Sequence, residues 1–133
     1  FTSYEVHNLI SKRSNIIQCK RKIDFNSMRF KNYIGCSTVI YDTSFFGKVY
    51  FPLLRKRQDW GLWMLLLKKV NFAYGLNKIL TKYSIRKNSL SYDKFSLLKY
   101  NFLFYRKVLN YNYLKSILYL ILFLAYHFKI IKN

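Results

Sequence analysis

The chain has 133 residues, of which 24 are Lys or Arg and 5 are Asp or Glu, so its formal net charge is +19. Self-repulsion on this scale opposes a compact monomer in water and predicts an anionic partner, either nucleic acid or an anionic membrane surface. Because 52% of the residues are hydrophobic, the composition excludes a disordered basic tail. The many Phe, Tyr, Ile, Asn and Lys residues have AT-rich codons, which indicates an organellar genome.

No catalytic or metal-binding motif stands out. Cys19 and Cys36 do not form a CxxC pair, and His7 and His127 lie near opposite ends of the chain. The sequence therefore predicts free thiols, no metal site within this chain and no cofactor, while a metal site shared with another chain stays open. The motifs GxSxG, HExxH and GxxxxGK[ST] are missing, so we expect a protein that is not an enzyme. The first ten residues do not resemble a secretory signal.

Charge and turn residues divide the chain into two predicted parts. All 5 acidic residues precede residue 94, and the only proline lies with three of the 4 glycines between residues 35 and 61. We predict an α+β fold with a compact module over residues 1–66, built from a small antiparallel sheet with flanking helices. A basic and apolar α-helical extension over residues 67–133 follows it.

In chain order, the first predicted element is a short helix over residues 7–13, with its apolar residues facing inward. Small and β-branched residues predict a strand over residues 37–40, and residues 49–51 suit its antiparallel partner. Residues 42–47 would form the hairpin loop, whose final glycine can take a positive φ. Pro52 cannot donate to a ladder, so the second strand ends there or lies at an edge.

The rest of the chain predicts three helices. Hydrophobic residues recur every three or four positions from Trp60 to about residue 72, and further helices are expected over residues 91–109 and 113–128. The uncharged stretch 116–128 is shorter than the roughly 20 residues that span a bilayer. It is therefore either a helix buried against protein neighbours or, extended upstream through Tyr111, a membrane helix. Because it is apolar nearly all round, we expect burial within an assembly.

The order of turn and strand signals over residues 27–61 resembles a known family. The matching residues, in chain order, are Ser27, Tyr33, Ile34, Gly35, Ile40, Tyr41, Asp42, Gly47, Lys48, Tyr50, Pro52 and Gly61. Their spacing is similar to that of the universal small-subunit ribosomal protein family numbered nineteen, which lies in the head of the subunit. The resemblance covers residues 7–67, and residues 70–76 resemble the start of another head protein, number thirteen.

This resemblance implies a structural constituent of the small subunit of a mitochondrial ribosome, located in the matrix. Its partners would be small-subunit rRNA and head proteins thirteen and fourteen, with no small-molecule substrate and no membrane contact expected. Composition alone fits a plastid as well as a mitochondrion. The alternative hypothesis is a small accessory subunit of an inner-membrane respiratory complex, anchored by its C-terminal helix, with Lys and Arg facing anionic lipid.

Basic residues of the first part are the candidate RNA contacts, because each can neutralise a phosphate. The alternative is a solvated loop or, for the hairpin lysine, protection of a sheet edge. Apolar residues of two predicted helices are candidate protein contacts or core residues. The predicted RNA-binding residues are Lys12, Arg13, Lys20, Arg21, Lys22, Arg29, Lys31, Lys48, Arg55, Lys56 and Arg57, and the predicted protein contacts are Trp60, Trp63, Leu120 and Phe123.

Overall fold

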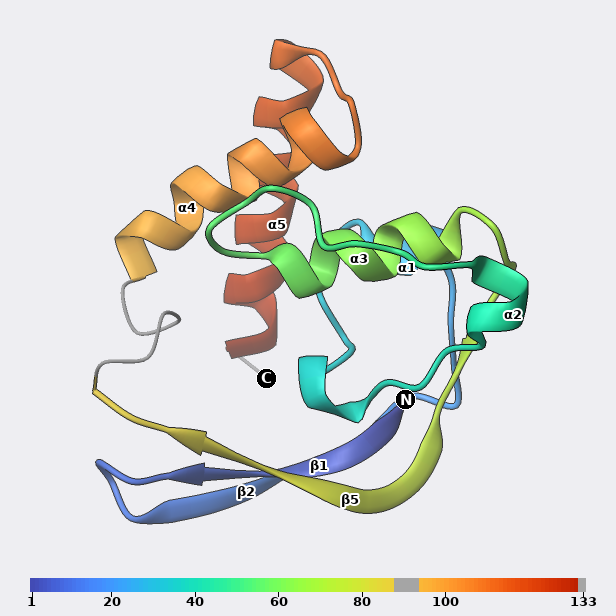
Figure 1. The fold of residues 1–133 in the computed structure, drawn as a ribbon. Helices are drawn as coiled ribbons and strands as arrows, with labels where there is room; N and C mark the ends of the chain where they lie inside the picture. Colours follow the sequence, from blue (N-terminus) through green and yellow to red (C-terminus); the bar gives the residue numbers. More distant parts are fainter. Residues whose placement is uncertain (88–93, 132–133) are drawn as a thin grey trace.

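The computed structural model describes residues 1–87 and 94–131. The chain begins with a sheet, continues through short helical turns to a buried helix, and ends in a helical hairpin (Figure 1). Strands and helices occupy separate stretches of the described chain, and the sheet is small. The predicted α+β class is therefore confirmed.

The main sheet is mixed, with the strand order β2-β1-β5. β1 (Thr2–Asn8) pairs antiparallel with β2 (Arg13–Ile17) and parallel with β5 (Leu76–Ile85), and the three strands lie at the bottom of Figure 1. A second, antiparallel sheet pairs β3 (Lys22–Ile23) with β4 (Ala73–Tyr74). The prediction of a purely antiparallel sheet is wrong, because β5 returns to β1 after a long crossover and runs parallel to it.

A tight turn joins β1 to β2, where the sequence predicts a helix over residues 7–13. The side-chain oxygen of Asn8 accepts hydrogen bonds from the backbone N–H groups of Ile10 (2.9 Å) and Ser11 (3.1 Å), and Lys12 takes a φ of 54°. Asn side chains favour such turns because they bond to the backbone a few residues further on. The predicted helix is wrong, because these local bonds and the β1–β2 ladder satisfy the backbone groups that a helix would use.

Residues 24–57 connect the strand β3 to the central helix through irregular chain and three short helical turns. These turns are α1 (Phe25–Met28), η1 (Cys36–Thr38) and α2 (Thr43–Phe46). The side chains of Asp24 and Asp42 cap α1 and α2 by accepting hydrogen bonds from backbone N–H groups of the first turn. The segment is thus held by local caps and by the burial of Met28, Ile34 and Leu54 in the core, rather than by a sheet.

The hairpin predicted over residues 37–51 does not form. Residues 39–42 and 47–51 are irregular, and Gly47 takes the expected positive φ, 70°, as the C-cap of α2. The predicted strands over residues 37–40 and 49–51 are wrong, because Val39 and Val49 pack individually against the hydrophobic core and make no ladder with each other. The ribosomal resemblance depends on this hairpin, so it loses its structural basis.

α3 (Gln58–Leu67) is the helix predicted from Trp60, and it forms the centre of the core. Trp60 and Met64 are fully buried. The Trp60 indole N–H donates to the carbonyl oxygen of Met28 at 2.7 Å, and its ring stacks on Phe104 with the centroids 4.1 Å apart. The helix ends at residue 67, before the predicted residue 72.

The described chain from residue 94 is a helical hairpin that packs on α3 (Figure 1). α4 (Lys94–Leu103) continues into the π-helical turn η2 (Phe104–Val108), and α5 (Tyr113–Ile131) returns beside them. The predicted helices are confirmed, except that residues 91–93 lie outside the described residues. Phe104 and Tyr105 belong to the same core as α3, so the two predicted parts of the chain share one hydrophobic core.

The predicted extension is not helical throughout, because β4 and β5 lie within residues 67–87. The boundary at residue 66 stays a prediction. In α5, Tyr119, Leu120 and Phe123 pack against the core, whereas Leu118 and Ile121 are more than half exposed. Across residues 1–87 and 94–131, no helix combines the length and the apolarity that crossing a membrane requires.

Candidate functional site

A cavity of about 570 Å³ opens between the start of α3, the turn η1 and the main sheet. Tyr4 of β1 and Tyr83 of β5 come from neighbouring strands, and Asn32, Ser37 and Gln58 come from the segment before α3 and its first residue. These side chains offer hydroxyl and amide groups beside aromatic rings. A concave site with a few polar groups among apolar surface is typical of binding sites for small molecules.

Asp59 is the one carboxylate among the described residues that line this cavity. It lies in the first turn of α3, where the helix dipole favours a negative charge. The side-chain amide of Asn32 donates a hydrogen bond to Oδ2 of Asp59 at 3.0 Å, which orients the carboxylate. A carboxylate held in this way can take a proton from a bound hydroxyl group.

Three consecutive basic residues precede α3 and line the same cavity. Arg57 takes a left-handed backbone conformation, with φ 66°, and its Nε donates to Oδ1 of the buried Asn101 at 2.7 Å. Burial lowers the pKa of the Arg57 guanidinium, and the charge of Asp59 opposes that shift. Arg55 is exposed and Lys56 is partly buried. The cavity therefore presents cationic groups and a fixed carboxylate to the same ligand.

The charge of Asp59 acts on other groups in the cavity. Partial burial raises the pKa of the Cys36 thiol, and the charge of Asp59 raises it further. Burial also raises the pKa of Tyr4, with smaller contributions from Tyr83 and Asp59. Both groups stay protonated at neutral pH, so each can donate a hydrogen bond to a ligand.

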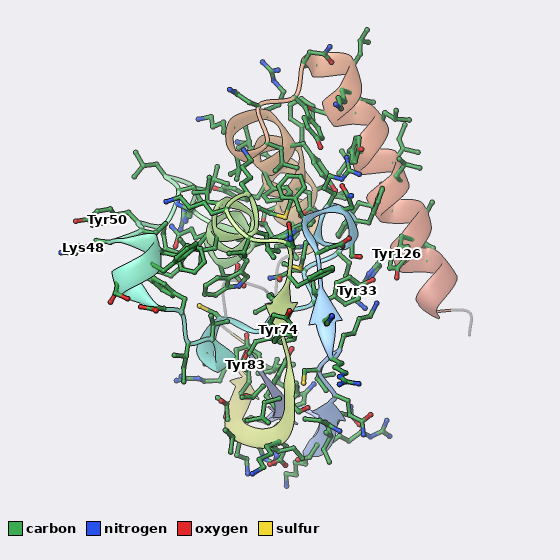
Figure 2. The ribbon with its side chains drawn as sticks, turned by 90° about the vertical axis from the view of Figure 1, so that its right-hand side faces the viewer. Tyr33, Lys48, Tyr50, Tyr74, Tyr83 and Tyr126 are labelled. Atoms are coloured by element: carbon green, nitrogen blue, oxygen red, sulfur yellow. The ribbon has the colours of Figure 1, made fainter. Side chains whose placement is uncertain are left out.

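Most of the predicted RNA-binding residues lie away from this cavity, and only Arg55, Lys56 and Arg57 line it. Figure 2 shows Lys48 and Tyr50 at one edge of the molecule, far from Tyr126 at the other. The remaining predicted residues are spread over other parts of the structure. Lys12 and Arg13 lie at the β1–β2 turn, and Arg21 is exposed on the surface. The others lie against aromatic rings: Lys20 and Lys31 over Tyr33, Lys22 over Phe72, and Arg29 against Tyr119.

The predicted protein contacts pack against this chain's own core. Trp60 and Trp63 are buried in it, and Leu120 and Phe123 pack on it from α5. Their contact with another protein stays a prediction. Cys19 and Cys36 are free thiols, and among residues 1–87 and 94–131 no three His, Cys, Asp or Glu side chains lie close enough together to hold a metal ion.

Sequence reasoning did not identify Asp59 as a site residue. Its signal is local: one acidic residue stands directly after a basic cluster, at the start of a predicted helix. Asn32, Tyr4 and Tyr83 carry no such signal, because segments far apart in the sequence bring them to the cavity.

The chain is similar to bacterial glycosyltransferases. It is 32% identical over 100 residues, 75% of this chain and 40% of the relative, to the putative teichuronic acid biosynthesis glycosyltransferase TuaG of Bacillus subtilis (strain 168). It is also 32% identical over 100 residues, 74% of this chain and 39% of the relative, to the UDP-Glc:alpha-D-GlcNAc-diphosphoundecaprenol beta-1,3-glucosyltransferase WfgD of Escherichia coli. A second Escherichia coli enzyme with the same described activity, WfaP, is 34% identical over 74 residues, 56% of this chain and 29% of the relative.

The chain thus spans about 40% of the length of the first two relatives. The chain matches no model of a known protein family, and no solved structure matches it.

These relatives overturn the ribosomal identification. The predicted structural role in translation, the predicted lack of enzymatic activity and the alternative as a respiratory subunit are wrong, because the relatives are enzymes that transfer sugars. The predicted partners, rRNA and head proteins without a small-molecule substrate, and the mitochondrial location are wrong for the same reason. The resemblance followed the spacing of glycine, proline and turn residues, which unrelated α+β chains can share.

Proposed function

We propose that this chain forms part of a glycosyltransferase and that the cavity at Asp59 binds the acceptor of the transferred sugar. The observation that carries the proposal is the position of Asp59. The stretch similar to TuaG covers 75% of the 133 residues of this chain. Residue 59 lies near the middle of the chain, so any stretch of that length includes it. Within that stretch, Asp59 is the cavity's carboxylate and is oriented by Asn32.

The chemistry of WfgD gives this carboxylate a task. Its name describes the transfer of glucose from UDP-Glc into a β-1,3 linkage. Because the glucosyl group of UDP-Glc is α-linked, a β product requires the acceptor hydroxyl to attack the anomeric carbon from the face opposite the leaving diphosphate. A new C–O bond forms, the bond to the diphosphate oxygen breaks, and one base takes the hydroxyl proton. We assign that base to Asp59.

The other groups of the cavity fit the same reaction. The donor and the acceptor named for WfgD both carry a diphosphate. Arg55 and Lys56 line the cavity beside Asp59, and charge-assisted hydrogen bonds from such groups bind a diphosphate strongly. Tyr4 and Tyr83 contribute hydroxyl groups and ring faces that suit a sugar. Because the chain spans only part of its relatives, the activity is proposed for the whole enzyme and the acceptor side for this chain.

The test is sugar transfer by the full-length protein that contains this chain. The substrates are radiolabelled UDP-Glc and a soluble acceptor with α-GlcNAc-diphosphate on a short alkyl chain. Asp59→Asn keeps the shape and the hydrogen bond capacity of the side chain but removes the base, so kcat should fall by about 10²- to 10⁴-fold. Asp42→Asn is the matched control, because Asn still caps α2 and residue 42 does not line this cavity.

The control should keep the kcat of the parent protein, and both variants should melt at similar temperatures. Arg55→Ala should raise KM for the acceptor more than it lowers kcat, because the residue is assigned to binding. The proposal is wrong if Asp59→Asn keeps a normal kcat, or if the parent protein transfers no glucose from UDP-Glc to this acceptor.

A further inference from the structure

One side of α5 is apolar and uncovered. We define the outer face of α5 as the residues that point away from the core, which recur at helical spacing and are between 37% and 79% exposed: Leu114, Ile117, Leu118, Ile121, Leu122 and Phe128. Figure 2 shows α5 along the right-hand edge of the molecule with no other element on its outer side. A contiguous exposed apolar surface of this kind marks an interaction site.

The opposite side of α5 is fixed to the rest of the chain. Tyr119 stacks on Phe30, with ring centroids 5.7 Å apart, and its hydroxyl accepts a hydrogen bond from Nη1 of Arg29 at 2.9 Å. Further along, the hydroxyl groups of Tyr33 and Tyr126 lie 2.5 Å apart and point toward each other (Figure 2). These contacts hold the helix against rotation, so its outer face stays exposed and its inner face stays on protein.

The charged residues of the C-terminal segment that carries the outer face have one sign. Residues 94–133 contain no Asp or Glu. Arg106 and Lys107 lie in η2, which contacts α5, and Lys115 lies in the first turn of α5. Lys20 and Lys31 lie over the ring of Tyr33, whose hydroxyl group meets that of Tyr126 in the C-terminal half of α5. Arg106, Lys107 and Lys115 are exposed. The outer face is thus an apolar strip with a cationic rim.

We infer that the outer face of α5 docks on the surface of an anionic lipid membrane, with the helix lying in the plane of the interface. The leucine, isoleucine and phenylalanine side chains enter the boundary between headgroups and acyl chains. The lysine and arginine side chains contact the lipid phosphates. A second copy of this chain fits less well, because it would bring a second cationic rim and a second charge of +19 against the first.

Vesicle sedimentation tests the inference. The probes are vesicles of phosphatidylglycerol mixed with phosphatidylcholine, and vesicles of phosphatidylcholine alone. The protein should bind the anionic vesicles and bind the neutral ones much more weakly. Leu118→Asp/Ile121→Asp should weaken binding to the anionic vesicles by about tenfold or more, because the carboxylates oppose both apolar insertion and the negative surface.

Matched controls separate docking from general stickiness. Leu53→Asp/Leu80→Asp places the same charges on side chains that are 99% and 66% exposed on other segments, and it should bind as the parent does. Lys107→Gln/Lys115→Gln should weaken binding to anionic vesicles by about fivefold for each charge removed. Circular dichroism melting checks that each variant is folded.

Several results would overturn the inference: equal binding to anionic and neutral vesicles, no binding to either, or an Asp pair on α5 that binds as the parent does. A dimer in analytical ultracentrifugation that Leu118→Asp/Ile121→Asp abolishes would assign the outer face to a second copy instead. The inference rests on α5 and its charges and does not depend on the proposed function. Asp59→Asn should bind vesicles normally, so the two proposals fail separately.

Discussion

Replacing Trp60 by Phe should cost more stability than the same change at Trp63. Both indoles are buried, with 0% and 5% of their surface exposed, so both changes remove a similar part of an apolar ring. The two sites differ in hydrogen bonding. The Trp60 indole N–H donates to the carbonyl oxygen of Met28 at 2.7 Å, whereas the Trp63 indole nitrogen is buried without a partner among the described residues.

The magnitude follows from what each change leaves behind. The smaller ring leaves a cavity at either site, which costs about 1 kcal/mol at roughly 24 cal/mol per Å³. At Trp60 the carbonyl oxygen of Met28 also loses its donor, and an unsatisfied buried group costs about 1–3 kcal/mol. At Trp63 the change removes an unpaired donor, which offsets part of the cavity cost. We expect losses of about 2–4 kcal/mol at Trp60 and about 1 kcal/mol or less at Trp63.

Urea unfolding followed by far-UV circular dichroism measures both losses. Tryptophan fluorescence is unsuitable, because the chain has only 2 tryptophans and each variant removes one. If the free energies of unfolding of the two variants agree within about 0.5 kcal/mol, the Trp60 hydrogen bond does not stabilise the core and the reasoning is refuted.

Two further predictions concern the packing of α3 and the response to alkaline pH. In Gly61→Ala the new Cβ would lie 2.5 Å from Cγ of Pro52 and 3.3 Å from Cγ2 of Val108. The overpacking should lower the free energy of unfolding by about 1–3 kcal/mol in the same assay, despite the better helix propensity of alanine. An unchanged free energy of unfolding would show that Pro52 moves aside freely. Burial raises the pKa of Tyr105 above its ordinary value, so the folded state holds the phenolic proton more tightly than the unfolded state. Its contribution to stability is present below the unfolded pKa of about 10 and is lost as pH rises further. Tyr105→Phe should therefore flatten the decline of the free energy of unfolding above about pH 10, and an identical decline in both proteins would contradict this.

Local patterns in the sequence predict the longer helices correctly. α3 is recognisable because hydrophobic residues recur every three or four positions from Trp60, and α5 because residues 116–128 form a long uncharged, apolar stretch. Both signals are carried by neighbouring residues. The positive φ of Gly47 is predictable for the same reason, since its cause lies in the glycine itself.

Strand pairing is not predictable in this way. The β-branched and aromatic residues at positions 37–40 and 49–51 suit a strand, yet none of them forms one. Val39 and Val49 pack on the core, whereas Ile40 and Tyr50 are largely exposed. β1, in contrast, finds a parallel partner in β5 more than sixty residues later, with Tyr4 opposite Thr81 and Val6 opposite Tyr83. A strand depends on such a distant partner, so its own residues do not reveal whether it forms.

The charge of +19, the position of α3 and the apolar character of α5 can all be predicted without a structure, because they depend on composition and on residues close together in the chain. The folded chain was needed to show that Tyr4, Asn32, Asp59 and Tyr83 line one cavity, and which face of α5 is left uncovered. Both depend on contacts between segments far apart in the sequence, and the free energy of those contacts is not contained in any local pattern.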